Sequence, residues 1–309
     1  MAPNRRILAA LVFLAAGFAC VGGSDPPSPS PSGTAERGSL AALQAGADVE
    51  LSLLNAQSEL TTGENVFTFG LSSGPGELIG QGTPQVFVAT SPEEPALGPF
   101  EATWHEFTAY ELTGDRGPEP GLPGFFAATV EFPEPGNWLV AAAANVEDGS
   151  GVGVGAIAVV EASEAFAAVG SKALAVETPV ATKPSAVARF CTREPPDPLH
   201  YISLDDALSN GKPTVVTFGT PLLCESRMCG PVVDEVMLVF EEVGKEKANF
   251  VHVEVFPTRQ VDEPARPFLQ WGFESEPWTV VIDGDGTIRA RLEGPASATL
   301  VEQALRPLL

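Results

Sequence analysis

A change of hydrophobic period near residue 187 constrains the fold more than any other feature of the sequence. Beyond it, PTVVTFGT at 213–220 is a continuous, mostly β-branched run, which is typical of a strand buried on both faces of a sheet. The segment VVDEVMLVFEEV at 232–243 places its apolar residues on one helical face, and NFVHVEVF at 249–256 is a second buried strand. Buried strands that alternate with a helix predict an α/β domain with helices packed against a central sheet.

The rest of this region completes the predicted element order. Ser203 predicts the N-cap of a helix at 203–210, and Thr299 with Glu302 predicts a capping box for a last helix at 299–309. The remaining elements are a short helix at 267–272 and a hairpin with strands at 278–283 and 287–294. The predicted order is therefore α-β-α-β-α-β-β-α.

Residues 46–162 show a different pattern, in which short apolar runs alternate with turn clusters such as PEPG at 133–136. This spacing is typical of a small antiparallel sandwich, so we expect an immunoglobulin-like β domain with Phe132 and Trp138 in its core. His105 is the only histidine of this region and is a poor metal ligand by itself. Strands are predicted at 49–54, 65–71, 85–90, 125–132, 137–146 and 155–160.

The N-terminus has the pattern of an export signal. Arg5 and Arg6 precede an apolar run at 7–18, which is too short to span a bilayer. Cys20 follows small residues and precedes GGSDPPSPSPSG, so the segment resembles that of a bacterial lipoprotein whose first mature residue is a lipidated cysteine. Gly17 and Phe18 depart from the usual lipoprotein pattern, and ordinary signal-peptidase cleavage stays open. In both cases the mature chain is expected outside the cytoplasm.

Charge limits the classes of partner. The formal net charge is -23, from 40 acidic and 17 basic residues, which speaks against nucleic acid or an anionic membrane surface as a ligand. We therefore expect no nucleic-acid partner and contact with a membrane only through the lipid anchor. No cofactor and no resident metal are expected.

Two segments of the C-terminal region carry a resemblance to a known family. FGTPLLCESRMCGPV at 218–232 and SEPWTVVIDGDGTI at 275–288 resemble the cysteine loop and the cis-proline strand of thioredoxins. Together with TREPPDPLHYISLDDALSNGKP at 192–213, they look like a group of exported bacterial thioredoxin-domain proteins. The resemblance implies a thioredoxin-like fold, with Pro277 as the cis-proline and Glu276 in contact with substrate. Trp278 either shapes the substrate groove or belongs to the core.

The cysteine spacing departs from that of thioredoxins. If Cys229 is aligned with the first family cysteine, the second falls on Val232, so the partner of Cys229 is expected to be Cys224 in a C-x4-C motif. Pro231 fits the first turn of a helix, which places Cys229 at the positive end of the helix dipole, where a thiolate is favoured.

The resemblance implies thiol–disulfide exchange with protein thiols or disulfides outside the cytoplasm. In the mechanism expected from the sequence, the Cys229 thiolate attacks the substrate disulfide and Cys224 resolves the mixed disulfide. Arg227 should favour the thiolate, whereas Glu225 and Glu276 should disfavour it.

Three alternatives stay open at this point. A structural disulfide would close a loop of about six residues, which is worth only about 2 kcal/mol in the chain-entropy model. Copper-binding Sco-type proteins carry C-x-x-x-C on the same fold with a distant histidine, for which His200 and His252 are the candidates here. A tethered binding protein could use the thioredoxin-like domain as a scaffold only. Cys191 is expected to be either a small buried residue or an exposed third thiol.

The predicted organisation has five parts. They are a signal peptide at 1–19, a Pro/Ser-rich tether at 20–44, the immunoglobulin-like β domain at 45–162, a linker at 163–186 and the thioredoxin-like domain at 187–309.

Overall fold

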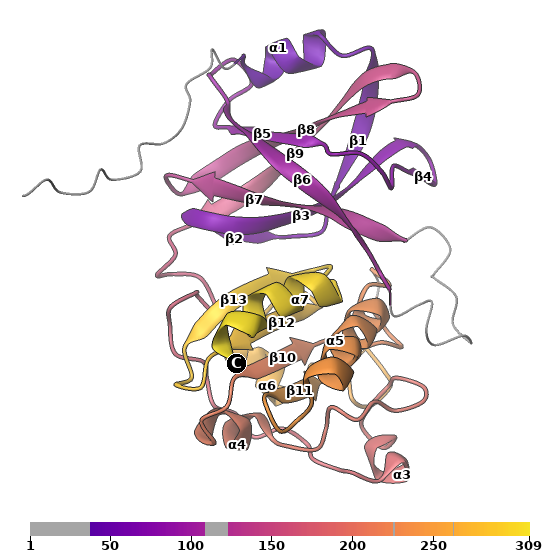
Figure 1. The fold of residues 1–309 in the computed structure, drawn as a ribbon, viewed down its shortest axis with the longest axis vertical. Helices are drawn as coiled ribbons and strands as arrows, with labels where there is room; N and C mark the ends of the chain where they lie inside the picture. Colours follow the sequence, from indigo (N-terminus) through magenta and orange to yellow (C-terminus); the bar gives the residue numbers. More distant parts are fainter. Residues whose placement is uncertain (1–37, 109–122, 225, 262) are drawn as a thin grey trace, which may run out of the picture. The chain divides into compact units, whose positions relative to one another are not determined.

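The structure is a computed structural model, and it describes residues 38–108, 123–224, 226–261 and 263–309. Residues 37–309 form one compact unit, which contains a nine-stranded β region and a separate four-stranded sheet covered by helices (Figure 1). The predicted signal peptide, Cys20 and Glu225 lie outside the described residues.

The β region is a sandwich of two layers around one apolar core. Its hydrogen-bonded strand order is β1-β3-β7-β6-β5-β8-β9-β2, with β4 on β3 and a further pairing of β1 with β9. The strands are β1 (Val49–Asn55), β2 (Glu59–Thr61), β3 (Gly63–Gly74), β4 (Glu77–Leu78), β5 (Gln85–Ala89), β6 (Leu97–Glu106), β7 (Gly124–Phe132), β8 (Gly136–Val146) and β9 (Gly149–Val160).

Two strands pass between the layers. The first half of β1 runs parallel to β9 and its second half runs antiparallel to β3. β6 likewise pairs with β5 in its first half and with β7 in its second half. The six predicted strands are all present, but β2, β4 and β6 were missed. The sequence of β6 gives a weak signal because it contains Pro99 and buries few of its side chains.

The sandwich core is rich in aromatic side chains. Phe67 and Phe69 stack with ring centroids 5.2 Å apart, and Phe126 lies 5.7 Å from Phe69. The prediction that Phe132 and Trp138 are core residues is confirmed, because both are buried and their rings meet edge to face at 5.4 Å. Burial of such large apolar side chains supplies much of the driving force for folding.

The four-stranded sheet has the order β11-β10-β12-β13, in which β10 is parallel to β11 and antiparallel to β12. This is the thioredoxin-like arrangement that the sequence predicts, and the predicted order of elements is confirmed. The elements are α4 (Leu204–Ser209), β10 (Thr214–Phe218), α5 (Cys229–Val243), β11 (Asn249–Val253), α6 (Arg266–Trp271), β12 (Trp278–Ile282), β13 (Ile288–Glu293), α7 (Ala298–Leu305) and a 3-10 turn η1 (Arg306–Leu308).

Helices cover both faces of this sheet, which explains why its central strands consist mostly of apolar residues. Every residue of β10, β11 and β12 is buried. Val215 of β10 packs in a cluster with α5 and α7, whereas Val216 and Phe218 pack in a cluster with α4 and α6. Successive β10 side chains thus enter two different cores, as the alternation of a strand requires.

Two segments outside these sheets are also ordered. Helix α1 (Leu40–Ala45) lies at the end of the range that the sequence assigns to the tether, and Leu40 is buried against the sandwich. Within 163–186, Val176 belongs to a core cluster of the α/β domain, and the Thr178 N–H donates to Ser203 Oγ at 2.9 Å. Helix α3 (Pro184–Val187) follows.

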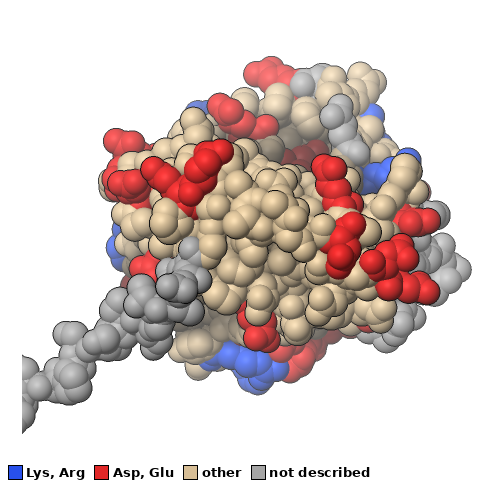
Figure 2. Space-filling model, turned by 90° about the horizontal axis from the view of Figure 1, so that it is seen from above, with Lys and Arg blue, Asp and Glu red and all other residues tan. Residues whose placement is uncertain are grey.

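The sandwich and the α/β domain are in direct contact within the compact unit. Phe107 and Phe125 of the sandwich belong to the same apolar cluster as α5 and α7. Ser58 Oγ donates to Glu293 at 2.6 Å, and His105 Nδ1 lies 2.9 Å from Ser297 Oγ. His105 thus joins the two domains by a hydrogen bond. Figure 2 shows one face of the molecule, on which Asp and Glu side chains are more numerous than Lys and Arg.

Candidate functional site

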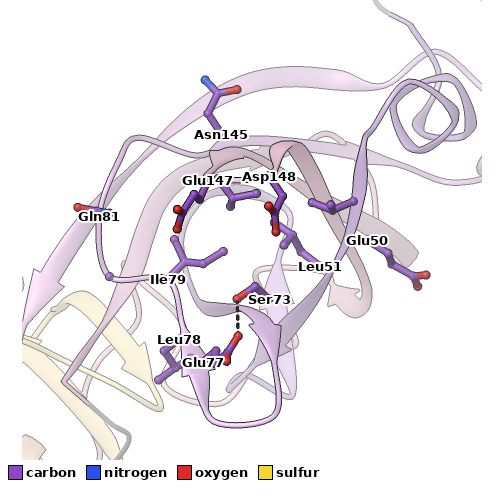
Figure 3. Close-up of a pocket in the computed structure, with 13 residues that line it drawn as sticks. Glu50, Leu51, Ser73, Glu77, Leu78, Ile79, Gln81, Asn145, Glu147 and Asp148 are labelled. Atoms are coloured by element: carbon purple, nitrogen blue, oxygen red, sulfur yellow. Dashed lines mark hydrogen bonds between the residues drawn. The ribbon is translucent and has the colours of Figure 1, made fainter.

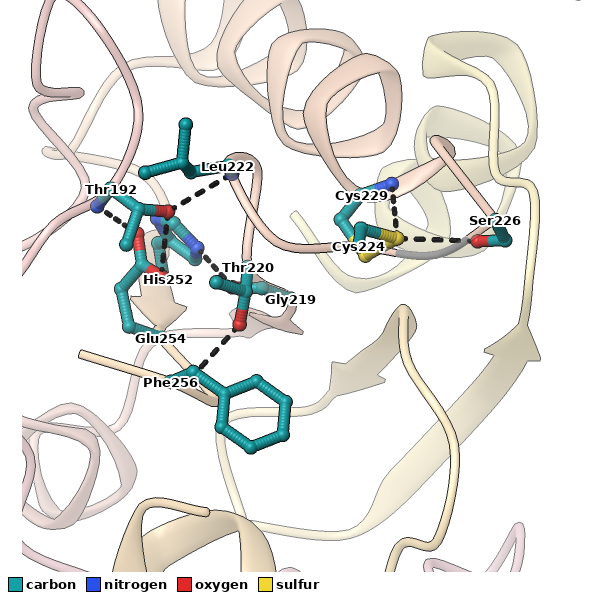
Figure 4. Close-up of a disulfide and its surroundings, with 10 residues drawn as sticks. All are labelled: Thr192, Gly219, Thr220, Leu222, Cys224, Ser226, Cys229, His252, Glu254 and Phe256. Atoms are coloured by element: carbon teal, nitrogen blue, oxygen red, sulfur yellow. Dashed lines mark hydrogen bonds between the residues drawn. A yellow bond between two sulfur atoms is a disulfide. The ribbon is translucent and has the colours of Figure 1, made fainter. Parts of the chain in front are cut away.

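The candidate site lies at the corner between β10 and α5. Cys224 is in the loop after β10, Cys229 is the first residue of α5, and the two form a disulfide with Cα atoms 5.9 Å apart (Figure 4). That separation is within the usual range for disulfides. Pro231 lies in the first turn of α5, as the sequence predicts, where the missing N–H is tolerated.

The two sulfur atoms of this pair have different surroundings. Cys229 is fully buried, whereas Cys224 is half-buried and sits in the loop. The backbone N–H of Cys229 donates to Cys224 Sγ at 3.3 Å, and Ser226 Oγ lies 3.2 Å from the same sulfur. Cys224 Sγ thus lies at the N-terminus of α5, where an N–H donor and the helix dipole stabilise a thiolate.

The cis-proline loop lies directly beside the buried cysteine. The Glu276–Pro277 peptide bond is cis, which confirms the prediction for this bond. Gly219, one residue after β10, fits between the two elements. A Cβ at Gly219 would lie 3.3 Å from Cys229 Cβ and 3.6 Å from Pro277 Cβ, so a larger residue there would press on both.

Glu276 brings a carboxyl group to the disulfide. One of its oxygens and the sulfurs of Cys224 and Cys229 lie within 4.8 Å of one another. Oε2 of Glu276 is buried and has no hydrogen-bond partner. Burial raises the pKa of Glu276 to about 7, although a hydrogen bond with Thr220 acts in the opposite direction. The carboxyl group therefore titrates near neutral pH within reach of both sulfurs.

Trp278 belongs to the core. Its side chain is buried, stacks on Phe273 with ring centroids 4.4 Å apart, and has the guanidinium carbon of Arg291 at 4.9 Å from its centroid. Its Nε1 donates to Ser275 Oγ at 3.2 Å. Of the two roles that the sequence leaves open for Trp278, the structure favours packing over shaping a groove.

A groove runs from the dithiol loop along the sandwich. It is a cavity of about 630 Å³, and on the α/β side it is bordered by Ser226, Met228 and Glu276. Leu54, Phe107 and Phe125 are among the residues that the sandwich contributes. Because Ser226 Oγ lies 3.2 Å from Cys224 Sγ, one end of this mostly apolar groove lies close to the sulfur of the half-buried Cys224. Its size is that of ordinary ligand sites.

The two histidines of the α/β domain, His200 and His252, do not belong to the dithiol site. His252 Nε2 lies 3.0 Å from the Gly219 carbonyl oxygen and Nδ1 lies 2.8 Å from Asp197. His200 and Cys191 join them in a buried cluster. Of the two alternatives that the sequence leaves open for Cys191, the structure shows the buried residue and not the exposed thiol. The Sco-type arrangement, in which His252 or His200 would join Cys224 and Cys229, is not the grouping found among the described residues.

A second pocket lies within the sandwich, between the β1, β3–β4 and β8–β9 segments (Figure 3). Its volume is about 560 Å³, and Glu50, Glu77, Glu147 and Asp148 line it. Ser73 Oγ donates to Glu77 at 3.3 Å. Acidic surface clusters of this kind are common and assign no function by themselves.

Comparisons with known proteins give low overall similarity. No family model and no curated protein matches the chain. Among solved structures, a secreted thiol-disulfide isomerase from Corynebacterium glutamicum is 16% identical with a TM-score of 0.29, and the alignment covers 35% of this chain and 75% of that one. A thioredoxin-family thiol:disulfide interchange protein from Chlorobium tepidum is 17% identical with a TM-score of 0.28, covering 45% of this chain and 99% of that one.

An immunoglobulin-type domain is also among the solved structures that the comparison found. The titin M3 domain is 18% identical with a TM-score of 0.19, and the alignment covers 36% of this chain and 97% of the domain. At these TM-scores the likeness carries no weight, so the fold assignment depends on strand order and the site assignment on geometry. In the described part of the chain, no helix is long and apolar enough to cross a membrane.

Proposed function

We propose that the chain is an extracytoplasmic thioredoxin-like thiol–disulfide oxidoreductase that carries an immunoglobulin-like β domain. The observation that carries this proposal is the asymmetric disulfide: Cys224 is the less buried of the two residues and its sulfur accepts an N–H from the start of α5, while its partner Cys229 is fully buried. A reactive cysteine needs both access to substrate and stabilisation of its thiolate.

The roles of the two cysteines follow from their exposure. The sequence assigns the attack to Cys229, but a fully buried sulfur cannot reach a disulfide of another protein. Cys224 is therefore the attacking residue in our proposal. Its thiolate attacks one sulfur of the substrate disulfide, which forms a mixed disulfide and releases the other substrate sulfur as a thiolate.

Cys229 then completes the exchange. Its thiol loses a proton to the Glu276 carboxylate, and the resulting thiolate attacks the Cys224 sulfur of the mixed disulfide. The internal disulfide closes and the second substrate thiolate leaves, so two electrons pass from the dithiol to the substrate. With the internal disulfide as the starting state, the same steps run in reverse and oxidise a substrate dithiol.

The groove indicates the class of substrate. A substrate disulfide that reaches Cys224 would bring its flanking residues along the apolar surface formed by Leu54, Phe107 and Phe125. We therefore propose polypeptides with apolar residues near their cysteines as substrates, and a lipid anchor at Cys20 that holds the enzyme at the outer face of the membrane.

Catalysed exchange is the direct test. The full mature chain should accelerate reduction of a peptide disulfide by glutathione, and the Cys224→Ser/Cys229→Ser double variant should not. Equal rates for the two proteins would contradict the proposal. The anchor is tested separately, because Cys20→Ala should release the protein into the medium.

A second candidate is a scaffold whose disulfide is structural, and the full burial of Cys229 favours it. In that case the disulfide would resist reductant until the domain unfolds, and the double variant would lose stability without loss of any exchange activity.

A further inference from the structure

Four buried side chains with metal-binding atoms meet beside Gly219. They are Cys191, Asp197, His200 and His252, and their ligand atoms all lie within 4.8 Å of one another. They come from three places in the chain: the segment after α3, the segment before α4, and strand β11. None of these four residues takes part in the proposed thiol–disulfide exchange.

Three distances within the cluster, all measured from Asp197 Oδ2, lie within or slightly below the range between the ligand atoms of a tetrahedral metal site. Around Asp197 Oδ2, His252 Nδ1 lies at 2.8 Å, Cys191 Sγ at 3.1 Å and His200 Nε2 at 3.5 Å. Zinc bonds of about 2.0 to 2.3 Å place tetrahedral ligand atoms roughly 3.3 to 3.6 Å apart. A small outward shift of each side chain would therefore admit an ion.

One buried nitrogen atom of the cluster makes no hydrogen bond. His200 Nε2 is buried and makes no hydrogen bond, since 3.5 Å from the Asp197 oxygen is beyond the usual N–H···O range. His200 is only 2% exposed, so solvent does not satisfy this nitrogen. Buried polar atoms normally have a partner, and an ion between the four side chains would supply one.

His252 already has the orientation of a metal ligand. Its Nε2 lies 3.0 Å from the Gly219 carbonyl oxygen, which can only accept, so Nε2 carries a proton. Its Nδ1 faces the other three side chains. A hydrogen bond from the second ring nitrogen to a backbone carbonyl is the usual way in which a metal-binding histidine is held in position.

The charges of the cluster match a divalent ion. An Asp197 carboxylate and a Cys191 thiolate carry two negative charges, and two neutral imidazoles add none, so a divalent cation would make the site neutral. Neutrality is needed because the whole cluster is buried.

We propose that Cys191 Sγ, a carboxylate oxygen of Asp197, His200 Nε2 and His252 Nδ1 bind one zinc ion. Four protein ligands of mixed sulfur, nitrogen and oxygen type in a closed site are typical of structural zinc, which needs no open position for substrate. Binding would release one proton from the Cys191 thiol and one from the His252 ring. The ion would tie the segments around 191 and 197–200 to β11, next to the dithiol strand.

Zinc stoichiometry tests this proposal. The full mature chain is incubated with zinc chloride, dialysed, and analysed for bound metal, and its affinity is measured against a chromophoric chelator. Wild type should retain one zinc ion. Cys191→Ser and His200→Gln should each weaken binding by more than the about 10- to 100-fold that results from removing a residue hydrogen-bonded to a metal ligand.

Matched controls separate this site from the dithiol. His105→Gln replaces the one histidine outside the cluster, and the Cys224→Ser/Cys229→Ser double variant removes the other two thiols of the α/β domain. Both should retain one zinc ion. Zinc binding that survives Cys191→Ser and His200→Gln but disappears in the double variant would overturn the proposal and assign zinc to the dithiol.

Measurements on wild type keep the proposal testable if a cluster variant fails to fold. Zinc should raise the melting temperature, protect Cys191 from alkylation during partial unfolding, and release protons in an unbuffered titration. Cobalt in place of zinc should give a thiolate-to-metal absorption band. Retention of no zinc together with an unchanged melting temperature would show that the cluster is only a hydrogen-bond network, and tighter binding of copper(I) than of zinc would overturn the choice of metal.

Discussion

The α/β domain contains two thiol sites on either side of one residue, and they differ in what their sulfur atoms can reach. Cys224 is half-buried, at the end of a groove, and bonded to another sulfur. Cys191 is fully buried among two histidines and a carboxylate. Gly219 lies between them: its carbonyl oxygen contacts His252 of the buried cluster, and a Cβ at this position would lie 3.3 Å from Cys229 Cβ. The exposure of a cysteine and the residues that it contacts thus decide whether it can exchange with a substrate or only stabilise the fold.

The carboxyl groups of the two sites also differ, because their pKa values are shifted in opposite directions. Burial raises the pKa of Glu276 to about 7, because hydrogen bonding compensates only in part. Burial also tends to raise the pKa of Asp197, yet its contacts with His252 and His200 hold that pKa well below the usual value. The first carboxyl can accept a proton near neutral pH, whereas the second remains ionised as a structural partner.

The largest effects are expected from single cysteine variants of the exposed site. Cys224→Ser should lose exchange activity to the uncatalysed background. Cys229→Ser should perform the first step and accumulate mixed disulfides through Cys224, because the resolving sulfur is missing. Mass spectrometry under non-reducing conditions measures both. Trapping by Cys224→Ser through Cys229 instead would reverse the proposed order and restore the order expected from the sequence.

Glu276→Gln should slow resolution by about 10²- to 10⁴-fold, the usual contribution of a general base. The wild-type rate of closing the internal disulfide should rise with pH through about 7 as the carboxyl group ionises, and the variant should lack this step. Stopped-flow measurement of the closing step from pH 5 to 9 provides the comparison. Superimposable pH profiles would remove Glu276 from the mechanism.

Asp197→Asn should affect stability rather than exchange. It leaves His252 in the interior without its carboxylate, and loss of one member of a buried ion pair costs about 3 to 5 kcal/mol. Urea unfolding in the presence of a chelator measures the loss, and the exchange rate of the folded fraction should match that of wild type. A stable variant with slowed exchange would show that the two sites act as one.

Glu276 should also make stability depend on pH. Its pKa in the folded protein is about 7, above its usual 4.5, so the unfolded chain loses the proton first as pH rises. The free energy of unfolding should therefore decrease between about pH 4.5 and 7. Glu276→Gln should remove this contribution, which urea unfolding of both proteins across that range would detect as a difference in slope.

The smallest effect is expected from Cys191→Ala in metal-free protein. Because Cys191 has no contact with substrate in the proposed mechanism, the exchange rate should be equal to that of wild type within error. The reduced native protein should also react with iodoacetamide at Cys224 and not at Cys191. Fast alkylation of Cys191 would contradict its burial.

The element order of the α/β domain could be predicted because each element has a long and consistent period. The hydrogen bonds of the caps could not be predicted, since they depend on other segments. Ser203 is the N-cap residue of α4, as predicted, but its Oγ bonds with Thr178 and Asp205 and not with an N–H of the helix. Helix α7 begins before Thr299, so the side chain of Ser297 caps it.

The dithiol could be predicted from the resemblance to thioredoxins, but its asymmetry could not, because exposure is set by how the loop folds.

The buried cluster was missed as a unit. Cys191 and Asp197 lie in a Pro-rich stretch without a regular period, and His252 reaches them only through the tertiary fold. The spacing of Asp197 and His200, three residues apart, was the one local signal.

A redox titration of the native protein distinguishes a catalytic dithiol from a structural disulfide. The chain is equilibrated in thiol–disulfide buffers, quenched, and alkylated, and the state of each cysteine is read by mass spectrometry, with Cys191 as the internal reference. We predict that Cys224 and Cys229 titrate together with a midpoint between about -120 and -270 mV, the range of catalytic dithiols, while Cys191 stays unlabelled. A midpoint below about -300 mV, or opening of the disulfide only on unfolding, would identify a structural disulfide and contradict the account.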